Sequence, residues 1–183
     1  MIVAPAPSRQ VPADVPGRCR AACDTPDVHD ADAVYRDLAP AVLGYLRAQG
    51  AADPEDLLMD VFVAVVRDVE RVQGDTAAVR RWVFTIAHHR VVDQRRHSAR
   101  RTRLRSISDL TDRSVPDAMS TGPDPELVTA LAALTPEQRD VLGLRVVADL
   151  PVADVAKILR KRPDAVKALQ HRATSKLAEL LDA

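Results

Sequence analysis

Apolar residues recur along most of the chain with the helical period of about 3.6 residues, and no segment shows the strict alternation of a half-buried strand. The clearest example is residues 54–70, where one broad face is apolar and the opposite face is acidic. The apolar face comprises Leu57, Leu58, Val61, Phe62, Val65 and Val69. Asp53 can cap the first turn and Pro54 suits the first helical position, so the pattern predicts an amphipathic helix over residues 54–70.

The same spacing predicts two more helices in the first half of the chain. Residues 31–48 carry a stripe of apolar side chains, and Gly50 follows as a stop signal. A short loop, Gln73-Gly74-Asp75-Thr76, leads into a predicted helix over residues 77–97. Trp82 lies on the apolar stripe of that helix, so we expect it in the core rather than as an exposed stacking platform.

The end of the chain carries the pattern of a helix-turn-helix. Thr135-Pro136-Glu137-Gln138 combines a hydroxyl cap, a proline and a glutamine, which predicts the start of a helix that ends near Asp149. Two short amphipathic helices are predicted over residues 151–159 and 163–181, and Arg160-Lys161-Arg162 joins them. Two helices joined by a tight turn are typical of DNA-binding hairpins.

These elements fall into four segments. Residues 1–29 are rich in proline and are expected to be a disordered tail. Residues 30–98 form one helical domain, residues 99–124 have the composition of a flexible linker, and residues 125–183 form a second helical domain. The predicted fold class is all-α, with two small helical domains.

Charge is sorted along the chain, although Lys+Arg and Asp+Glu are both 26 and the formal net charge is zero. Residues 53–75 hold seven acids and only two bases, Arg67 and Arg71. The acids are Asp53, Glu55, Asp56, Asp60, Asp68, Glu70 and Asp75. Residues 80–105 then hold nine arginines against Asp93, and residues 157–176 hold seven bases against Asp164. This order indicates one basic protein partner and two contacts with a polyanion.

The sequence contains no motif for catalysis. It lacks a glycine-rich phosphate loop, a nucleophile elbow, an H-E-x-x-H motif and a Cys-x-x-Cys pair. Cys19 and Cys23 with nearby His29 lack a fourth zinc ligand, and His88-His89 are expected to be surface histidines. We therefore expect no enzyme activity, no metal and no cofactor. No signal peptide or membrane span is evident, which favours a cytoplasmic protein without membrane insertion.

The helix-turn-helix has the charge that DNA binding requires. Lys167, His171 and Arg172 stand opposite the apolar stripe of the last helix, and the basic turn lies at its N-terminus. Such a helix can enter a major groove while the turn contacts phosphates.

Three motifs together resemble group IV (extracytoplasmic-function, ECF) sigma factors of bacterial RNA polymerase. Residues 53–62 (DPEDLLMDVF) resemble the family's D-x-E-D-L-x-Q-E-x-F segment, and residues 81–96 (RWVFTIAHHRVVDQRR) resemble its A-W-L-x-x-I-A-R-N-x-x-x-D-x-x-R helix. Residues 134–139 (LTPEQR) and 154–173 resemble its C-terminal domain. The resemblance covers residues 30–183 and implies a sigma-2-like helical bundle and a sigma-4-like helix-turn-helix domain.

The resemblance implies a division of labour between the two domains. The acidic helix would bind the clamp helices of the polymerase β′ subunit through Asp53, Glu55, Asp56, Leu57, Asp60, Val61 and Phe62. The loop and the basic helix would read the opened −10 element through Gly74, Asp75, Thr76, Arg80, Arg81, His89, Arg90, Asp93, Arg95 and Arg96. The last domain would read the −35 element through Arg160, Lys161, Arg162, Lys167, Ala168, His171 and Arg172.

The resemblance implies further partners, and at some positions this sequence differs from the family pattern. It implies promoter DNA, the β flap of the polymerase and an anti-sigma factor as partners, and a linker that threads the polymerase channel. The family's Arg-Asn pair is replaced by His88-His89, and the usual glycine of the turn is replaced by Arg160. Glycine adopts left-handed backbone angles most readily, so the second change leaves open whether the turn has the usual glycine-supported conformation.

Two other functions remain open on the residues alone. A stand-alone helix-turn-helix regulator would bind an operator without polymerase, but it has no need of the acidic block at residues 53–75. A helical adaptor that binds no DNA would not need the two basic blocks.

Overall fold

A computed structural model describes residues 30–105 and 125–182, and all regular secondary structure in these ranges is helical. The N-terminal bundle consists of α1 (Ala31–Ala48), α2 (Pro54–Asp68), a single 3₁₀ turn η1 (Val69–Arg71) and α3 (Thr76–Arg105). The C-terminal bundle consists of α4 (Pro125–Ala132), α5 (Pro136–Leu142), a π-helical turn η2 (Gly143–Val147), α6 (Val152–Leu159) and α7 (Pro163–Leu181). The all-α prediction is confirmed.

Short polar side chains set the starts of several helices. Asp53 Oδ1 accepts a hydrogen bond from the backbone N–H of Asp56 over 2.9 Å, and Asp75 Oδ1 accepts one from Ala78 over 3.0 Å. Thr135 and Gln138 form a complete capping box at the start of α5. These bonds satisfy backbone donors that have no partner inside the helix.

Helix α4 was not predicted as a separate helix, and two other boundaries differ from the predicted ones by more than two residues. Helix α3 continues to Arg105, past the expected start of the linker at residue 99. Residues 98–105 contain neither proline nor glycine and are rich in arginine, so local propensity continues the helix. The rest of the expected linker, residues 106–124, and the expected tail, residues 1–29, lie outside the described residues. The segment after Leu142 changes to a π-helical turn before Asp149.

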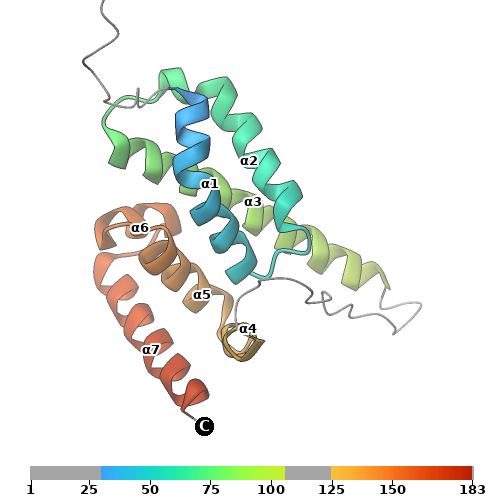
Figure 1. Cartoon of the computed structure of the whole chain (residues 1–183). Coiled ribbons are helices and arrows are strands. Elements are labelled where there is room, and N and C mark those ends of the chain that lie inside the picture. Colours follow the sequence, from blue (N-terminus) through green and yellow to red (C-terminus); the bar gives the residue numbers. More distant parts are fainter. Residues whose placement is uncertain (1–29, 106–124, 183) are drawn as a thin grey trace, which may run out of the picture.

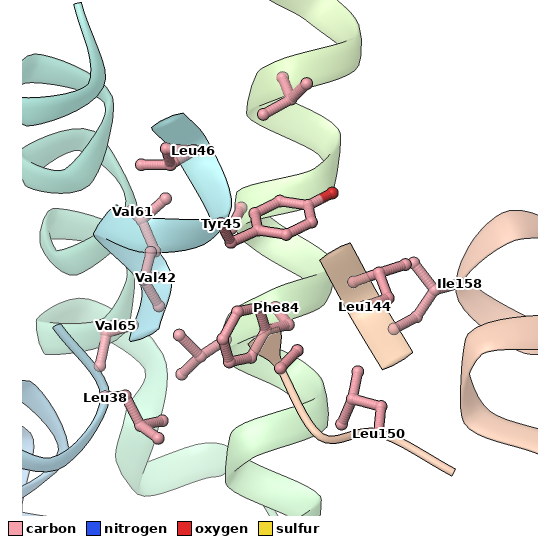
Figure 2. Close-up of a cluster of buried hydrophobic side chains, with 14 of the residues drawn as sticks. Leu38, Val42, Tyr45, Leu46, Val61, Val65, Phe84, Leu144, Leu150 and Ile158 are labelled. Atoms are coloured by element: carbon pink, nitrogen blue, oxygen red, sulfur yellow. The ribbon is translucent and has the colours of Figure 1, made fainter. Parts of the chain in front are cut away.

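The two bundles share one hydrophobic core, which sequence analysis did not predict. Tyr45 of α1 and Phe84 of α3 are fully buried and meet edge to face, with ring centroids 5.8 Å apart. Figure 2 shows Leu144, Leu150 and Ile158 of the C-terminal bundle beside these two rings. Figure 1 shows the same relation for the whole chain: the C-terminal bundle lies against α1 and α3, and α2 lies on the other side of α1.

Candidate protein-binding and nucleic-acid-binding surfaces

Helix α2 presents its acids to solvent. Glu55, Asp56 and Asp60 are exposed, whereas Asp53 serves as the helix cap. Arg47 Nη2 donates to Glu55 Oε1 over 2.7 Å, and this hydrogen bond lowers the pKa of Glu55. The acidic face is therefore accessible, as binding to a basic protein requires.

The apolar residues predicted for this surface lie elsewhere. Val61 and Phe62 are buried, and the Phe62 ring packs against Tyr35 at 4.7 Å between centroids. Leu57 is half-buried against the same core. Val61 and Phe62 therefore hold α2 in the bundle and do not offer their side chains to a partner in this arrangement.

A different apolar row is exposed beside the acids. Met59, Val63 and Val66 are 56%, 58% and 66% exposed, and their spacing of four and three residues places them on one face of α2. Sequence analysis missed this row because it followed only the wider stripe that faces the core. We call the exposed acids Glu55, Asp56 and Asp60, together with this row, the α2 surface.

The loop before α3 has a conformation that only glycine adopts without strain. Gly74 has φ +124°, and a Cβ on it would lie 2.7 Å from the Cβ of Ala78. Gly74, Asp75 and Thr76 are exposed. Asp75 is engaged in capping α3, so the loop geometry is fixed next to the start of the basic helix.

Three of the predicted −10 arginines contact the C-terminal bundle. Arg80 Nε donates to the carbonyl of Ala148 over 2.8 Å, and Arg81 Nη1 lies 3.3 Å from Asp154. Arg95 donates from Nη1 to Asp140 Oδ1 over 2.9 Å and from Nη2 to Gln49 Oε1 over 2.5 Å. Three arginines predicted to contact the −10 element thus contact residues of the other predicted domain, and none of those partners was predicted to bind DNA.

The remaining predicted −10 residues do not take part in this contact. His89, Asp93 and Arg96 are exposed, and Arg96 forms a loose ion pair with Asp93 at 3.6 Å. Arg90 is half-buried. Arg96, Arg100 and Arg101 are exposed, so arginines remain accessible at the C-terminal half of α3.

His88 is buried, so the prediction of a surface histidine is wrong. Its Nδ1 lies 3.1 Å from the hydroxyl of Tyr45, and it is only 6% exposed. Burial lowers the pKa of His88 and raises that of Tyr45, which favours the neutral form of both groups. The pair is a polar contact inside the core.

Trp82 is half-buried in the core, as predicted, and also borders a pocket. The pocket has a volume of about 340 Å³ and lies between the start of α3 and α6. Gln73, Ala78 and Arg81 line one side, and Lys157 and Ile158 of α6 line the other. Gln73 and Ala78, on either side of the Gly74–Thr76 loop, therefore border an open pocket shared with α6.

The turn of the helix-turn-helix is left-handed at Arg160, with φ +52° and ψ +44°. Arginine thus adopts the conformation for which the family uses glycine. Arg160 and Arg162 are exposed, whereas Lys161 Nζ pairs with Glu137 Oε1 at 2.7 Å. Two of the three turn cations are free to contact phosphate.

The predicted −35 face of α7 is accessible. Lys167, Ala168, His171 and Arg172 are exposed, while Val166 and Ala173 of the same helix are fully buried. Lys167 is only loosely paired with Asp164, at 3.9 Å. The helix is anchored by its apolar side and presents a basic side, as a recognition helix does.

No cluster of His, Cys, Asp and Glu able to hold a metal ion occurs within residues 30–105 and 125–182. Cys19, Cys23 and His29 lie outside those ranges. No helix in the described part of the chain is long and apolar enough to cross a membrane.

Two family models match successive parts of this chain. The model described as Sigma-70 region 2 matches residues 34–101, and the model described as Sigma-70, region 4 matches residues 125–177. Helices α1–α3 and the helix-turn-helix therefore match two regions of the Sigma-70 family in their natural order.

Curated relatives narrow the assignment. The ECF RNA polymerase sigma factor ShbA of Streptomyces griseus is 31% identical, with 84% of this chain and 90% of the relative covered. SigL of Mycobacterium tuberculosis is 32% identical, with 79% and 85% covered. BldN of Streptomyces coelicolor is 30% identical over 82% of this chain but only 56% of its own length. The chain belongs to the ECF RNA polymerase sigma factors, which direct promoter-specific transcription initiation.

Solved structures support the fold. RpoE of Bartonella quintana, in complex with the anti-sigma factor NepR, superposes with a TM-score of 0.69 at 21% identity, covering 84% of this chain and 98% of that one. CnrH, in complex with the cytosolic domain of CnrY, gives a TM-score of 0.57 at 22% identity, covering 83% and 87%. At this identity the likeness concerns the fold alone.

Proposed function

We propose that the α2 surface is where this sigma factor docks on core polymerase, against the basic clamp helices of β′. The exposed acidic side chains of Glu55, Asp56 and Asp60 supply charge complementarity, and the exposed row of Met59, Val63 and Val66 supplies apolar area. An exposed apolar row beside charges is typical of protein interfaces.

Promoter recognition is divided between α3 and α7 in this proposal. The Gly74–Thr76 loop holds a base of the opened −10 strand, and the arginines of α3 bind its backbone. Helix α7 enters the major groove of the −35 element through Lys167, Ala168, His171 and Arg172, while Arg160 and Arg162 contact phosphates.

The remaining parts of the proposal concern organisation and partners. Residues 30–98 form the unit that binds polymerase and the −10 element, residues 125–183 form the −35 unit, which also contacts the β flap, and the segment that follows α3 threads the polymerase channel between them. RpoE and CnrH are in complex with NepR and CnrY, which supports an anti-sigma partner for this chain as well. The protein acts in the cytoplasm and has no catalysis of its own.

One observation carries this proposal: a single chain exposes an acidic, partly apolar helix face on one bundle and a basic recognition helix on the other. The test is transcription by the host's purified core polymerase on host genomic fragments, with mapping of RNA 5′ ends. We expect starts at a set of sites with shared −35 and −10 sequences. If no starts depend on the chain, and it instead footprints a palindrome without polymerase, a stand-alone regulator is the correct function.

The docking assignment has its own test. Asp56→Lys with Asp60→Lys should weaken core-polymerase binding about tenfold or more, measured by fluorescence titration, because two attractive contacts become repulsive. Asp32→Lys with Asp37→Lys is the matched control. Asp32 lies in the first turn of α1 as Asp56 does in α2, and both control sites are exposed. Equal affinity of the two double variants contradicts the docking surface.

A further inference from the structure

We propose that Arg145 is a positioning residue for promoter recognition, which fixes through a hydrogen bond to Gln170 how the basic side of α7 is turned toward the −35 element. The inference rests on the proposed function of α7 and deepens it. It assigns a role in the accuracy of base reading to two residues that lie outside the predicted DNA contacts.

The side chain of Arg145 links three segments of the C-terminal bundle. Arg145 belongs to the π-helical turn η2 and is half-buried. Its Nε donates to Oε1 of Gln170 on α7 over 3.2 Å, and its Nη1 donates to the carbonyl of Leu150, in the connection between η2 and α6. The donors of a guanidinium group point in fixed directions within one plane. The two bonds together therefore define where the Gln170 side chain lies.

The place of Gln170 on α7 gives this bond its effect. Successive residues of an α-helix are about 100° apart around the axis. Gln170 therefore lies between the buried row of Val166 and Ala173 on one side and the exposed Lys167 on the other. A bond at the border between the buried and the basic side resists rotation of α7 about its own axis.

A second bond acts at the opposite border of the buried row. Lys176 lies on that side of α7, and its Nζ donates to the carbonyl of Ala133, just after α4, over 2.7 Å. The apolar packing of Val166 and Ala173 is not directional, so by itself it leaves the rotation of the helix loosely defined. Two directional bonds on either side of the apolar row fix that rotation.

The basic side of α7 includes one residue that depends on the rotation of the helix more than its neighbours do. Ala168 is exposed, and its single methyl group contacts a base only at close range, as against the methyl of thymine. Lys167 has a long flexible side chain that still reaches a phosphate after a small rotation. Loss of the Arg145–Gln170 bond should therefore reduce discrimination between −35 sequences and leave general affinity for DNA unchanged.

Gln170→Leu tests this, because it removes the acceptor without a change of charge. The full chain is bound to the host's core polymerase, and affinity is measured for a mapped promoter with its −35 element intact or scrambled. We expect the ratio of the two affinities to fall about fivefold or more, with the affinity for the scrambled template unchanged. Thr174→Val, one turn further along α7, is the matched control. Thr174 is exposed, its hydroxyl donates to carbonyls of its own helix, and the ratio should stay as in the natural chain.

Three further variants separate positioning from direct DNA contact. Gln170→Glu keeps an acceptor for Arg145 and should keep the ratio, while its negative charge lowers the affinity for both templates. Arg145→Met should lower the ratio, and its combination with Gln170→Leu should lower it little further, because both changes remove one link. If Arg145 contacts a phosphate instead, Arg145→Met lowers both affinities equally and reduces the slope of log affinity against log salt by about one. That result overturns the inference.

A measurement on the free chain reports the position of α7 without DNA. Spin labels are attached at Ala153→Cys on α6 and Ser175→Cys on α7, both exposed sites, with Cys19→Ser and Cys23→Ser in the same chain. Pulsed electron paramagnetic resonance gives the distribution of distances between the labels. We expect Gln170→Leu to broaden this distribution and Gln170→Glu to leave it narrow.

The two readouts separate this inference from the proposed function. The inference is overturned if Gln170→Leu leaves the distance distribution unchanged, or if the natural chain and this variant discriminate equally between the two templates. If the natural chain itself does not distinguish an intact from a scrambled −35 element, the proposed function of α7 fails. The label distances then decide alone: a broader distribution in Gln170→Leu supports positioning of α7 by Arg145, and an unchanged one refutes it.

Discussion

Arg95 on α3 and Asp140 on α5 form an ion pair at 2.9 Å, and they join segments 45 residues apart in sequence. Their side chains are 28% and 11% exposed, so solvent screens this pair less than the surface pairs of the chain. Because Gln49 also accepts from Arg95, the guanidinium is held from two sides.

Asp140→Ala should lower the free energy of unfolding by about 1–3 kcal/mol, because the partly buried Arg95 keeps only Gln49 as a side-chain partner. Urea unfolding followed by far-ultraviolet circular dichroism measures the change. Asp32→Ala removes the carboxylate of an exposed pair and should change stability by less than about 0.5 kcal/mol. Similar losses in the two variants would show that the Arg95 pair is no more than a surface contact.

Gly143→Ala and Gly44→Ala should have opposite effects. The added methyl at Gly143 meets Gln49 and Tyr45 at under 3 Å and should destabilise by about 1–3 kcal/mol. The methyl at Gly44 has its nearest neighbour at 3.6 Å, so the gain in helix propensity should stabilise by up to about 1 kcal/mol. Thermal unfolding of both variants measures the difference. A stabilised Gly143 variant would contradict the close contact between the bundles.

The Tyr45–His88 pair predicts how stability depends on pH. Burial is the largest cause that lowers the pKa of His88; His89 and Arg95 add to it, and Asp140 opposes it. A histidine with a lowered pKa in the folded state binds its proton more readily when unfolded, so stability is lost as pH falls below the ordinary value of 6.5. Urea unfolding at pH 7.5 and pH 5.5 should show a larger loss for the natural chain than for His88→Gln. An equal loss would mean that other groups govern the acid sensitivity.

Arg160→Gly should separate stability from DNA binding. A left-handed backbone at a residue with a Cβ, as at Arg160, costs about 1–2 kcal/mol, and glycine removes this cost. The greater freedom of glycine in the unfolded chain offsets part of the gain, so we expect a net stabilisation of up to about 1 kcal/mol. Loss of a phosphate contact should at the same time reduce the slope of log affinity against log salt by about one. The salt dependence of duplex binding checks this. A destabilised variant would indicate a role for the Arg160 side chain in the fold.

Lys167→Ala and Arg172→Ala should each weaken initiation at promoters with an intact −35 element. If the contact is to a base, the activation free energy of initiation should rise by about 1–3 kcal/mol. Run-off transcription on templates with and without that element provides the measurement. Arg36→Ala, on α1, removes an exposed cation far from α7 and serves as the control. A loss that is equal on every template would assign the two cations to phosphates.

Local features of the fold could be predicted from sequence because their causes are local. Helix α7 begins at Pro163 and ends at Leu181 as predicted, and Asp53 and Thr135 cap α2 and α5. Proline at the first position, a side-chain cap and an apolar period act within a few residues of each other.

Contacts between distant segments could not be predicted in this way. The burial of His88 depends on Tyr45, which lies 43 residues earlier. The sequence of α3 is the same whether its arginines face solvent or contact Asp154 and Asp140, so composition does not reveal these partners. Periodicity ranks faces by hydrophobicity and does not say which element covers them, so the exposed row of Met59, Val63 and Val66 was also missed.

Trp82 has one more consequence for work in solution. It is the single tryptophan of the chain, and it lines the pocket whose far wall is formed by Lys157 and Ile158. Withdrawal of that wall would hydrate the indole and shift its emission to longer wavelength. The emission wavelength of the natural chain therefore reports bundle separation in the free protein without an added label.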